Sequence, residues 1–205
     1  MDNSDDSILI NPTTPPRADA LRNHALLLET ARQLFVEHGV EAVTMSQIAQ
    51  AAGVGKGTLY RHFENKMALC FALLDQDQRE LQEATLRQLR QNNPPYEQLC
   101  WFLEQAARFV IRNEALLRGF DVSAETVSLQ HPAHFWWRQT IRMVLQKLAV
   151  YGDIDYLADT LYTMLHVDTI RFQRNMGYSV QRILDGLVLL VDKFILPPCG
   201  SDQTH

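Results

Sequence analysis

Hydrophobic positions along the 205-residue chain recur at intervals of three and four residues, the spacing of one face of an α-helix. Leu27, Ala31, Leu34 and Phe35 form one such stripe, and no stretch alternates polar and apolar residues as a half-buried strand does. The chain is therefore predicted to be all-α. Glycines and prolines divide the pattern into helices at about 21–38, 44–52, 55–63, 65–92, 96–113, 114–127, 132–151, 155–176 and 179–196.

The segment from Thr44 to Phe63, TMSQIAQAAGVGKGTLYRHF, predicts two short helices joined by a tight turn. Thr44 and Gln47 have the T-x-x-Q spacing of a capping box, in which each side chain bonds the other residue's backbone N–H. Gly53 suits the end of the first helix, because glycine adopts positive φ without a steric penalty. Leu59 and Phe63, four residues apart, give the second helix an inward face. This layout is typical of a helix-turn-helix DNA reader, although a plain helix pair in another all-helical fold has the same spacing.

Outward or edge positions of the second helix are basic, hydroxylated or aromatic. Lys56 and Arg61 can neutralise phosphates or reach guanine edges in the major groove. The hydroxyls of Thr58 and Tyr60 can donate to phosphate oxygens. Lys66 follows in the first turn of the next helix, where backbone N–H groups already favour an anion. These residue types in this order favour contact with DNA.

Residues 27–69 resemble the DNA-binding domain of the TetR family of transcriptional regulators. The resemblance rests on an ordered series: Ala31, Leu34-Phe35, Gly39, Thr44, Ile48-Ala49, Ala52-Gly53-Val54, Thr58-Leu59-Tyr60, Phe63 and Lys66. It implies that Thr44, Tyr60 and Lys66 hold phosphates and that outward residues of the second helix read bases. Gly55 departs from the family pattern, because many relatives have a capping serine there. The predicted DNA-binding residues are Thr44, Lys56, Thr58, Tyr60, Arg61, His62 and Lys66.

The resemblance also implies a domain plan and a partner. It predicts a helix-turn-helix domain at 21–66, an effector-binding and dimerisation domain at 67–196, and a tail at 197–205. The polar, acidic and proline-rich composition of residues 1–20 predicts a disordered arm. The last two helices would pair with a second copy as a four-helix bundle, so that the homodimer reads a palindromic operator in double-stranded DNA. The alternative is that the final helix is simply a core helix. The predicted dimer row is Val180, Leu184, Leu187, Val191 and Ile195.

Aromatic and methionine side chains gather in the second domain, where helical bundles often enclose apolar pockets. The resemblance implies a sensor for a small molecule, predicted here to be mostly apolar, although an aromatic stripe also fits ordinary core. His166 or Asp168 would be costly to bury without a partner, so each contacts either a ligand or a structural group such as Arg171. The predicted ligand-binding residues are Trp101, Phe102, Phe109, Phe120, Trp136, Met143, Tyr162, His166, Asp168 and Phe172.

The charge balance modifies this interpretation only slightly. The chain carries a net charge of −5, which is not typical of a DNA binder as a whole. Residues 17–66 have a small basic surplus, so the predicted DNA module is the least acidic part. No apolar run is long enough to span a bilayer, and the acidic N-terminus resembles neither a secretory signal nor a transit peptide. A cytoplasmic location without membrane contact is expected.

Other functional classes lack their motifs. GVGKGT fails as a P-loop, because Gly57 follows Lys56 where a serine or threonine is needed. His131 and His134 have no evident further ligands, so neither a metal nor a cofactor is expected. The three cysteines are far apart, and no catalytic motif is present, so the protein is not expected to be an enzyme.

The sequence thus predicts a transcriptional regulator, in the form of a repressor that a ligand releases from its operator. The alternatives are a helical protein-interaction module, or a ligand-independent DNA binder whose C-terminal domain is only structural.

Overall fold

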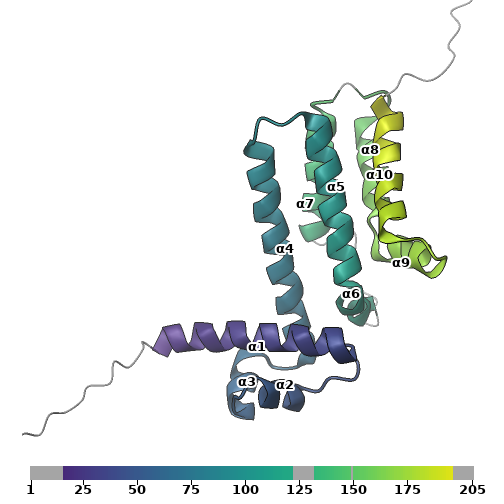
Figure 1. Cartoon of the computed structure of the whole chain (residues 1–205). Coiled ribbons are helices and arrows are strands. Elements are labelled where there is room, and N and C mark those ends of the chain that lie inside the picture. The colour runs from purple at the N-terminus through teal and green to yellow at the C-terminus, as the bar shows by residue number, and fades with distance from the viewer. Residues whose placement is uncertain (1–15, 122–131, 149, 196–205) are drawn as a thin grey trace, which may run out of the picture. The chain divides into compact units, whose positions relative to one another are not determined.

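The computed structural model describes residues 16–121, 132–148 and 150–195 of the chain (Figure 1). It divides into two compact units, Met1–Leu69 and Cys70–His205. The division falls just after the boundary predicted at residue 66. Each unit has its own buried core, so the two are taken separately below.

The N-terminal unit contains α1 (Pro16–His38), α2 (Met45–Ala51), α3 (Lys56–His62) and the first turn of α4 (Lys66–Arg90). Residues 16–20 are helical, which corrects the prediction that they belong to a disordered arm, and residues 1–15 of that arm lie outside the described residues. Proline suits the first turn of a helix because its missing N–H has no helical partner there. The core is formed by fully buried side chains: Leu27, Ala31, Ile48, Leu59 and Leu69.

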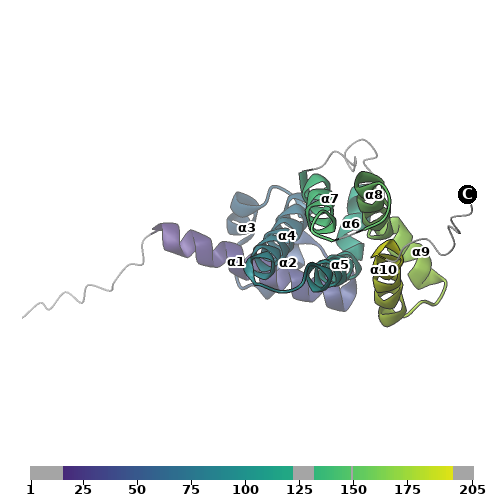
Figure 2. The ribbon, with the colours of Figure 1, turned by 90° about the horizontal axis from the view of Figure 1, so that it is seen from above.

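The C-terminal unit continues α4 and adds α5 (Pro95–Arg112), α6 (Glu114–Asp121), α7 (Pro132–Leu145), α8 (Ile154–Met164), α9 (Val167–Asn175) and α10 (Val180–Ile195). Seen end-on, α5, α7, α8 and α10 form the corners of a bundle: α5 packs on α7 and α10, and α8 packs on the same two helices (Figure 2). The described residues contain helices and turns but no strand, as the all-α prediction requires. None of the described helices has both the length and the apolar character needed to cross a bilayer.

The predicted helix at 155–176 is in fact two helices. His166 has extended backbone angles (φ −64°, ψ 140°), and its Nδ1 accepts from the Asp168 N–H at 3.4 Å, which starts α9. The Thr169 hydroxyl also donates to the Thr163 carbonyl at 3.1 Å across the break. Histidine is not among the usual N-cap residues, so this interruption was not predicted from the sequence.

Two other helices end earlier than predicted. α7 ends at Leu145 and not near residue 151, and the chain then turns, with the Tyr151 N–H donating to the Phe194 carbonyl at 2.9 Å. α6 is described as far as Asp121, and the remaining predicted helical residues, 122–127, lie outside the described part.

The central members of the row predicted to face a partner subunit are buried within their own unit. Leu184, Leu187 and Val191 are 6%, 4% and 0% exposed, because they pack into the core of their own unit. Val180 is half-buried against the same core, and the side chain of Ile195 lies outside the description. This burial favours the alternative that the final helix is a core helix. The opposite face of α10 is exposed at Arg182, Gly186, Leu189 and Lys193.

Candidate nucleic-acid interface

The first helix of the motif is started by the capping box that the sequence predicts. The Thr44 N–H and hydroxyl both donate to Gln47 Oε1 at 2.8 Å, and the Gln47 N–H donates to Thr44 Oγ1 at 3.3 Å. Gly53, with a φ of 66°, ends α2, and the Val54 N–H donates back to the Ala49 carbonyl at 3.0 Å. These local bonds fix the turn that leads into α3.

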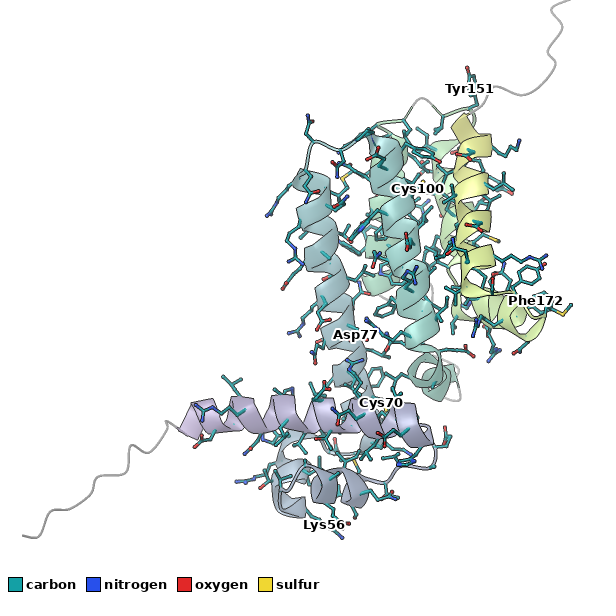
Figure 3. The ribbon with its side chains drawn as sticks, viewed as in Figure 1. Lys56, Cys70, Asp77, Cys100, Tyr151 and Phe172 are labelled. Atoms are coloured by element: carbon teal, nitrogen blue, oxygen red, sulfur yellow. The ribbon has the colours of Figure 1, made fainter. Side chains whose placement is uncertain are left out.

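The second helix buries one face and exposes the other. Leu59 and Phe63 are 0% and 4% exposed, as predicted for the inward face. Lys56, Tyr60 and Arg61 are exposed, and Lys56 projects from the unit on the side away from α1 (Figure 3). α3 therefore presents two cations and a phenol on a helix held firmly from beneath.

Thr58 and Arg61 are linked on the exposed side of α3. The guanidinium of Arg61 donates to Thr58 Oγ1 at 3.1 Å, and Thr58 itself is half-buried. Because arginine's donors lie in a rigid planar fork, this bond directs the remaining N–H groups outward along the helix. Thr58 orients Arg61 in this arrangement.

His62 lies at the edge of the motif, packed toward α1. Its ring centroid is 5.7 Å from that of His24 and 6.3 Å from that of Phe63. Partial burial, and secondarily the neighbouring His62, lower the pKa of His24. His62 is half-buried, so much of its surface serves the contact between α3 and α1.

Lys66 does not point outward as a phosphate ligand would. Its ammonium donates to the carbonyls of Val40 at 2.8 Å, Val43 at 3.1 Å and Glu41 at 3.3 Å. An ammonium has three N–H donors, and all three have a backbone acceptor here. The phosphate contact predicted for Lys66 stays a prediction, and the structure shows only that the ammonium is engaged by these carbonyls. The preceding Asn65 accepts from the Ala68 N–H at 2.8 Å and caps α4.

The aromatic residues predicted to line a ligand pocket are mostly ordinary core. Phe102 and Phe109 meet Trp137 edge-to-face, with ring centroids 6.4 Å and 5.3 Å from it. Tyr162 is buried with them, whereas Trp101 and Trp136 are half-buried at the edge of the core. Two predicted residues lie elsewhere on the surface: Met143 is 40% exposed, and Phe172, which projects from α9 in Figure 3, is 65% exposed. The side chain of Phe120 lies outside the description.

The polar pair predicted as a possible ligand contact is engaged within the protein. Arg171 donates to Asp168 Oδ1 at 2.6 Å, and His166 caps α9. This arrangement corresponds to the alternative in which these residues contact a structural group such as Arg171 and not a ligand. Together with the exposed Met143 and Phe172, it means that the ten predicted residues do not share one cavity.

Two buried polar residues that the sequence analysis missed lie side by side on α4. Asp77, 2% exposed, accepts from the Asn113 amide at 2.9 Å, between α4 and α5 (Figure 3). Gln78, 9% exposed, accepts from the Trp137 indole at 3.0 Å, and its own Nε2 is buried without a partner among the described residues. A signal was present, because both residues lie on the stripe that Leu74 and Leu81 define.

Nothing in the described residues suggests a metal centre. No three histidine, cysteine or acidic side chains of that part are placed to hold an ion. The side chains of His131 and His134 lie outside the description, as does Cys199. Cys70 is buried and Cys100 is half-buried, and neither forms a disulfide within the described residues.

Comparison with known proteins adds to this geometry. Residues 27–73 match the family described as "Bacterial regulatory proteins, tetR family". An HTH-type transcriptional regulator of Staphylococcus aureus (strain bovine RF122 / ET3-1) is 37% identical over 120 residues, which are 58% of this chain and 64% of the relative. The matched segment thus spans less than two thirds of that relative's length.

Solved structures extend the likeness to the whole fold. A gamma-butyrolactone receptor described as ArpA-like is 25% identical with a TM-score of 0.62, covering 88% of this chain and 91% of that one. A TetR/AcrR-family regulator from Thermobifida fusca is 19% identical with a TM-score of 0.68, covering 84% of this chain and 98% of that one. The second likeness shows the fold alone.

The fold and the exposed helix define a helix-turn-helix protein with a larger helical domain. Residues 27–73 carry the family likeness, because this segment matches the TetR family of bacterial regulatory proteins.

Proposed function

We propose that the chain is a sequence-specific DNA-binding transcriptional regulator that acts as a homodimer on a palindromic operator. The observation that carries the proposal is α3, whose exposed Lys56, Tyr60 and Arg61 stand above the buried Leu59 and Phe63. A second helix of this kind enters the major groove in helix-turn-helix proteins. Regulators related in sequence, such as the Staphylococcus aureus relative, support a regulator and not an enzyme.

The exposed residues divide by chemistry. Arg61, held by Thr58, has free N–H groups for a guanine edge, whereas Lys56 and Tyr60 suit phosphate oxygens. Thr44 caps α2 and presents an exposed side chain beside it, where a phosphate contact fixes the register on the duplex.

The test is fluorescence anisotropy of the full chain on DNA tiles that flank its own gene, at several salt concentrations. Arg61→Ala should relax specificity at one base position by about 1–3 kcal/mol. Arg87→Ala, which removes an exposed arginine from α4, is the matched control and should bind like the parent. Weak binding to every tile, with Arg61→Ala and Arg87→Ala alike, would contradict sequence-specific recognition by α3.

The dimer surface that we propose replaces the predicted row with the exposed side of α9 and α10. Phe172, Met176 and Leu189 are 65%, 64% and 56% exposed. Gly186 and Leu189 border a surface hollow of about 370 Å³, which also reaches Met164 of α8. An exposed apolar surface that includes a hollow suits a self-complementary contact, in which each copy inserts side chains into the other.

We also propose an effector for the C-terminal unit: a small, mostly apolar molecule with an acceptor oxygen. The unpartnered Nε2 of Gln78 is a buried donor within an apolar interior, and such a donor is costly unless something accepts from it. The solved gamma-butyrolactone receptor, 25% identical to this chain, supports a ligand of that class, because a lactone has carbonyl and ring oxygens.

Titration with a panel of γ-butyrolactones, followed by tryptophan fluorescence and by release from the operator, tests this effector. Trp137, bonded to Gln78, is the expected reporter. Gln78→Leu should weaken the response, whereas Gln76→Leu, an exposed change two positions away, should leave it intact. If no compound changes either signal while operator binding is tight, the lactone effector is contradicted and the ligand-independent DNA binder is favoured. Release, if seen, would favour repression relieved by the ligand.

A further inference from the structure

We infer that Gly57 is a specificity-determining residue, because a base edge of the operator packs against the bare backbone of α3 at this position. The contact is closer than a Cβ atom allows. The inference rests on the proposed DNA-binding function and deepens it, since it states which part of α3 meets the bases.

The fold itself does not require a glycine at position 57. Gly57 is the second residue of α3, it is exposed, and its φ lies outside the left-handed region. A Cβ atom built on it meets no neighbouring atom within 4 Å. Gly53 is different, because its φ of 66° is a conformation that residues with a Cβ rarely adopt. The backbone of α3 could therefore carry a side chain at position 57.

A glycine that the fold does not need lowers the stability of the protein. Glycine loses more conformational freedom on folding than any other residue, so alanine is the more stable choice wherever the backbone and the space accept it. One reason to keep a glycine at such a position is the close approach of another molecule to the backbone. Gly57 thus indicates a contact made by the exposed face of α3.

The neighbours of Gly57 on that face indicate that the other molecule is DNA. Arg61 lies four residues after Gly57 and therefore on the same side of α3. Its guanidinium donates to Thr58, so the side chain runs back over the turn that contains Gly57. The group that fills the gap at Gly57 therefore belongs to the bases that Arg61 reads. A side chain at position 57 would hold α3 away from them.

The gap has the size of one methyl group, which is what an alanine would add. In the major groove, the C5-methyl of thymine is the apolar group that bases present. Thymine is therefore the first base to test as the occupant.

Urea unfolding and fluorescence anisotropy of the full chain should move in opposite directions in Gly57→Ala. The urea midpoint should rise, because alanine restricts the unfolded chain. Operator affinity should fall about tenfold, which corresponds to about 1.4 kcal/mol. Affinity for a non-specific duplex should stay unchanged, since phosphate contacts carry that binding. Ala25→Ser adds one atom to the exposed surface of α1 and should change neither affinity.

Operators in which deoxyuridine replaces one thymine at a time identify the occupant, because deoxyuridine lacks the methyl group. If a thymine methyl fills the gap, one replacement should weaken binding by the parent and let Gly57→Ala bind that duplex as tightly as the parent does. A tenfold loss that no replacement restores would support the close contact and assign it to another group on a base edge.

The inference and the proposed function fail in different ways. A Gly57→Ala protein that binds the operator as tightly as the parent overturns the close contact and leaves the proposed function standing. A lower urea midpoint also overturns it, because the fold itself would then need the glycine. Equal losses on the operator and on the non-specific duplex would show a general disturbance of α3 and no contact with a base. If the parent has no tight site, the proposed function fails and the contact fails with it.

Discussion

Gly55 occupies the N-cap of α3 with extended angles (φ −66°, ψ 145°) and supplies no side-chain bond to the helix. A Cβ added there would meet no atom within 4 Å. Gly55→Ser should therefore stabilise the protein by about 0.5–1 kcal/mol, through a new cap and a less flexible unfolded chain. Urea unfolding followed by circular dichroism measures the change.

Gly53 is the matched control, because its φ of 66° disfavours any residue with a Cβ. Gly53→Ser should destabilise the protein by about 1 kcal/mol. Equal effects of the two substitutions would mean that cap chemistry and backbone conformation do not govern this turn.

His24 gives the N-terminal unit a dependence on pH. Its pKa is lowered from 6.5, first by burial and then by His62, so the folded state favours the neutral ring. On acidification the unfolded chain takes up the proton first, and stability is lost as pH falls below about 6.5. The parent should therefore lose more of its melting temperature between pH 7.5 and 5.5 than His24→Gln does. Parallel losses in both proteins, measured by calorimetry, would remove His24 as the cause.

At the scale of elements, Asp77 joins α4 to the end of α5. Its buried carboxylate accepts from Asn113 at 2.9 Å and lies 3.3 Å from the Arg112 guanidinium. Asp77→Ala should cost about 2–4 kcal/mol, because the Asn113 amide would be left buried without this acceptor. Arg112 is 57% exposed, so Arg112→Ala should cost less than about 1 kcal/mol.

Urea unfolding monitored by tryptophan fluorescence compares the two, since all three tryptophans lie in this unit. A cost for Asp77→Ala no larger than that for Arg112→Ala would show that the Asp77–Asn113 bond does not hold α4 in place.

The elements that the sequence predicted well are those whose determinants are local. The Thr44–Gln47 box, the Gly53 turn and the inward Leu59 and Phe63 each involve residues within a few positions, and all are confirmed. The helix break at His166 was not predicted, because an imidazole nitrogen is a rare helix cap. The backbone acceptors of Lys66 were not predicted, because they lie 23 to 26 residues away in sequence and helical periodicity does not reach that far.

α10 shows a different limit. Its apolar residues cover more than one face, so the pattern indicated burial on both sides without saying which row faced inward. Packing against α5 and α8 determines which row of α10 faces the core, and it buries Leu184, Leu187 and Val191. Nothing in the helical pattern singled out the exposed Gly186 and Leu189.

At the scale of the whole molecule, the dimer contact that we propose through the exposed row of α10 would link assembly to DNA recognition. A palindromic operator has two half-sites, and binding the second is favoured only when the two copies of α3 are physically joined. Leu189→Glu places a charge in the middle of the proposed contact and should convert the dimer to a monomer. Operator affinity should then fall toward that of a single half-site, although α3 is untouched.

Sedimentation and anisotropy on the same samples test this link. Leu86→Glu, a change at a 46% exposed leucine of α4, is the control and should stay dimeric. The parent's melting temperature should rise with protein concentration by mass action, and that dependence should vanish in Leu189→Glu. A Leu189→Glu protein that remains dimeric and binds the operator tightly would place the subunit contact on another face. A monomeric variant with full operator affinity would instead mean that one copy of α3 is enough for recognition.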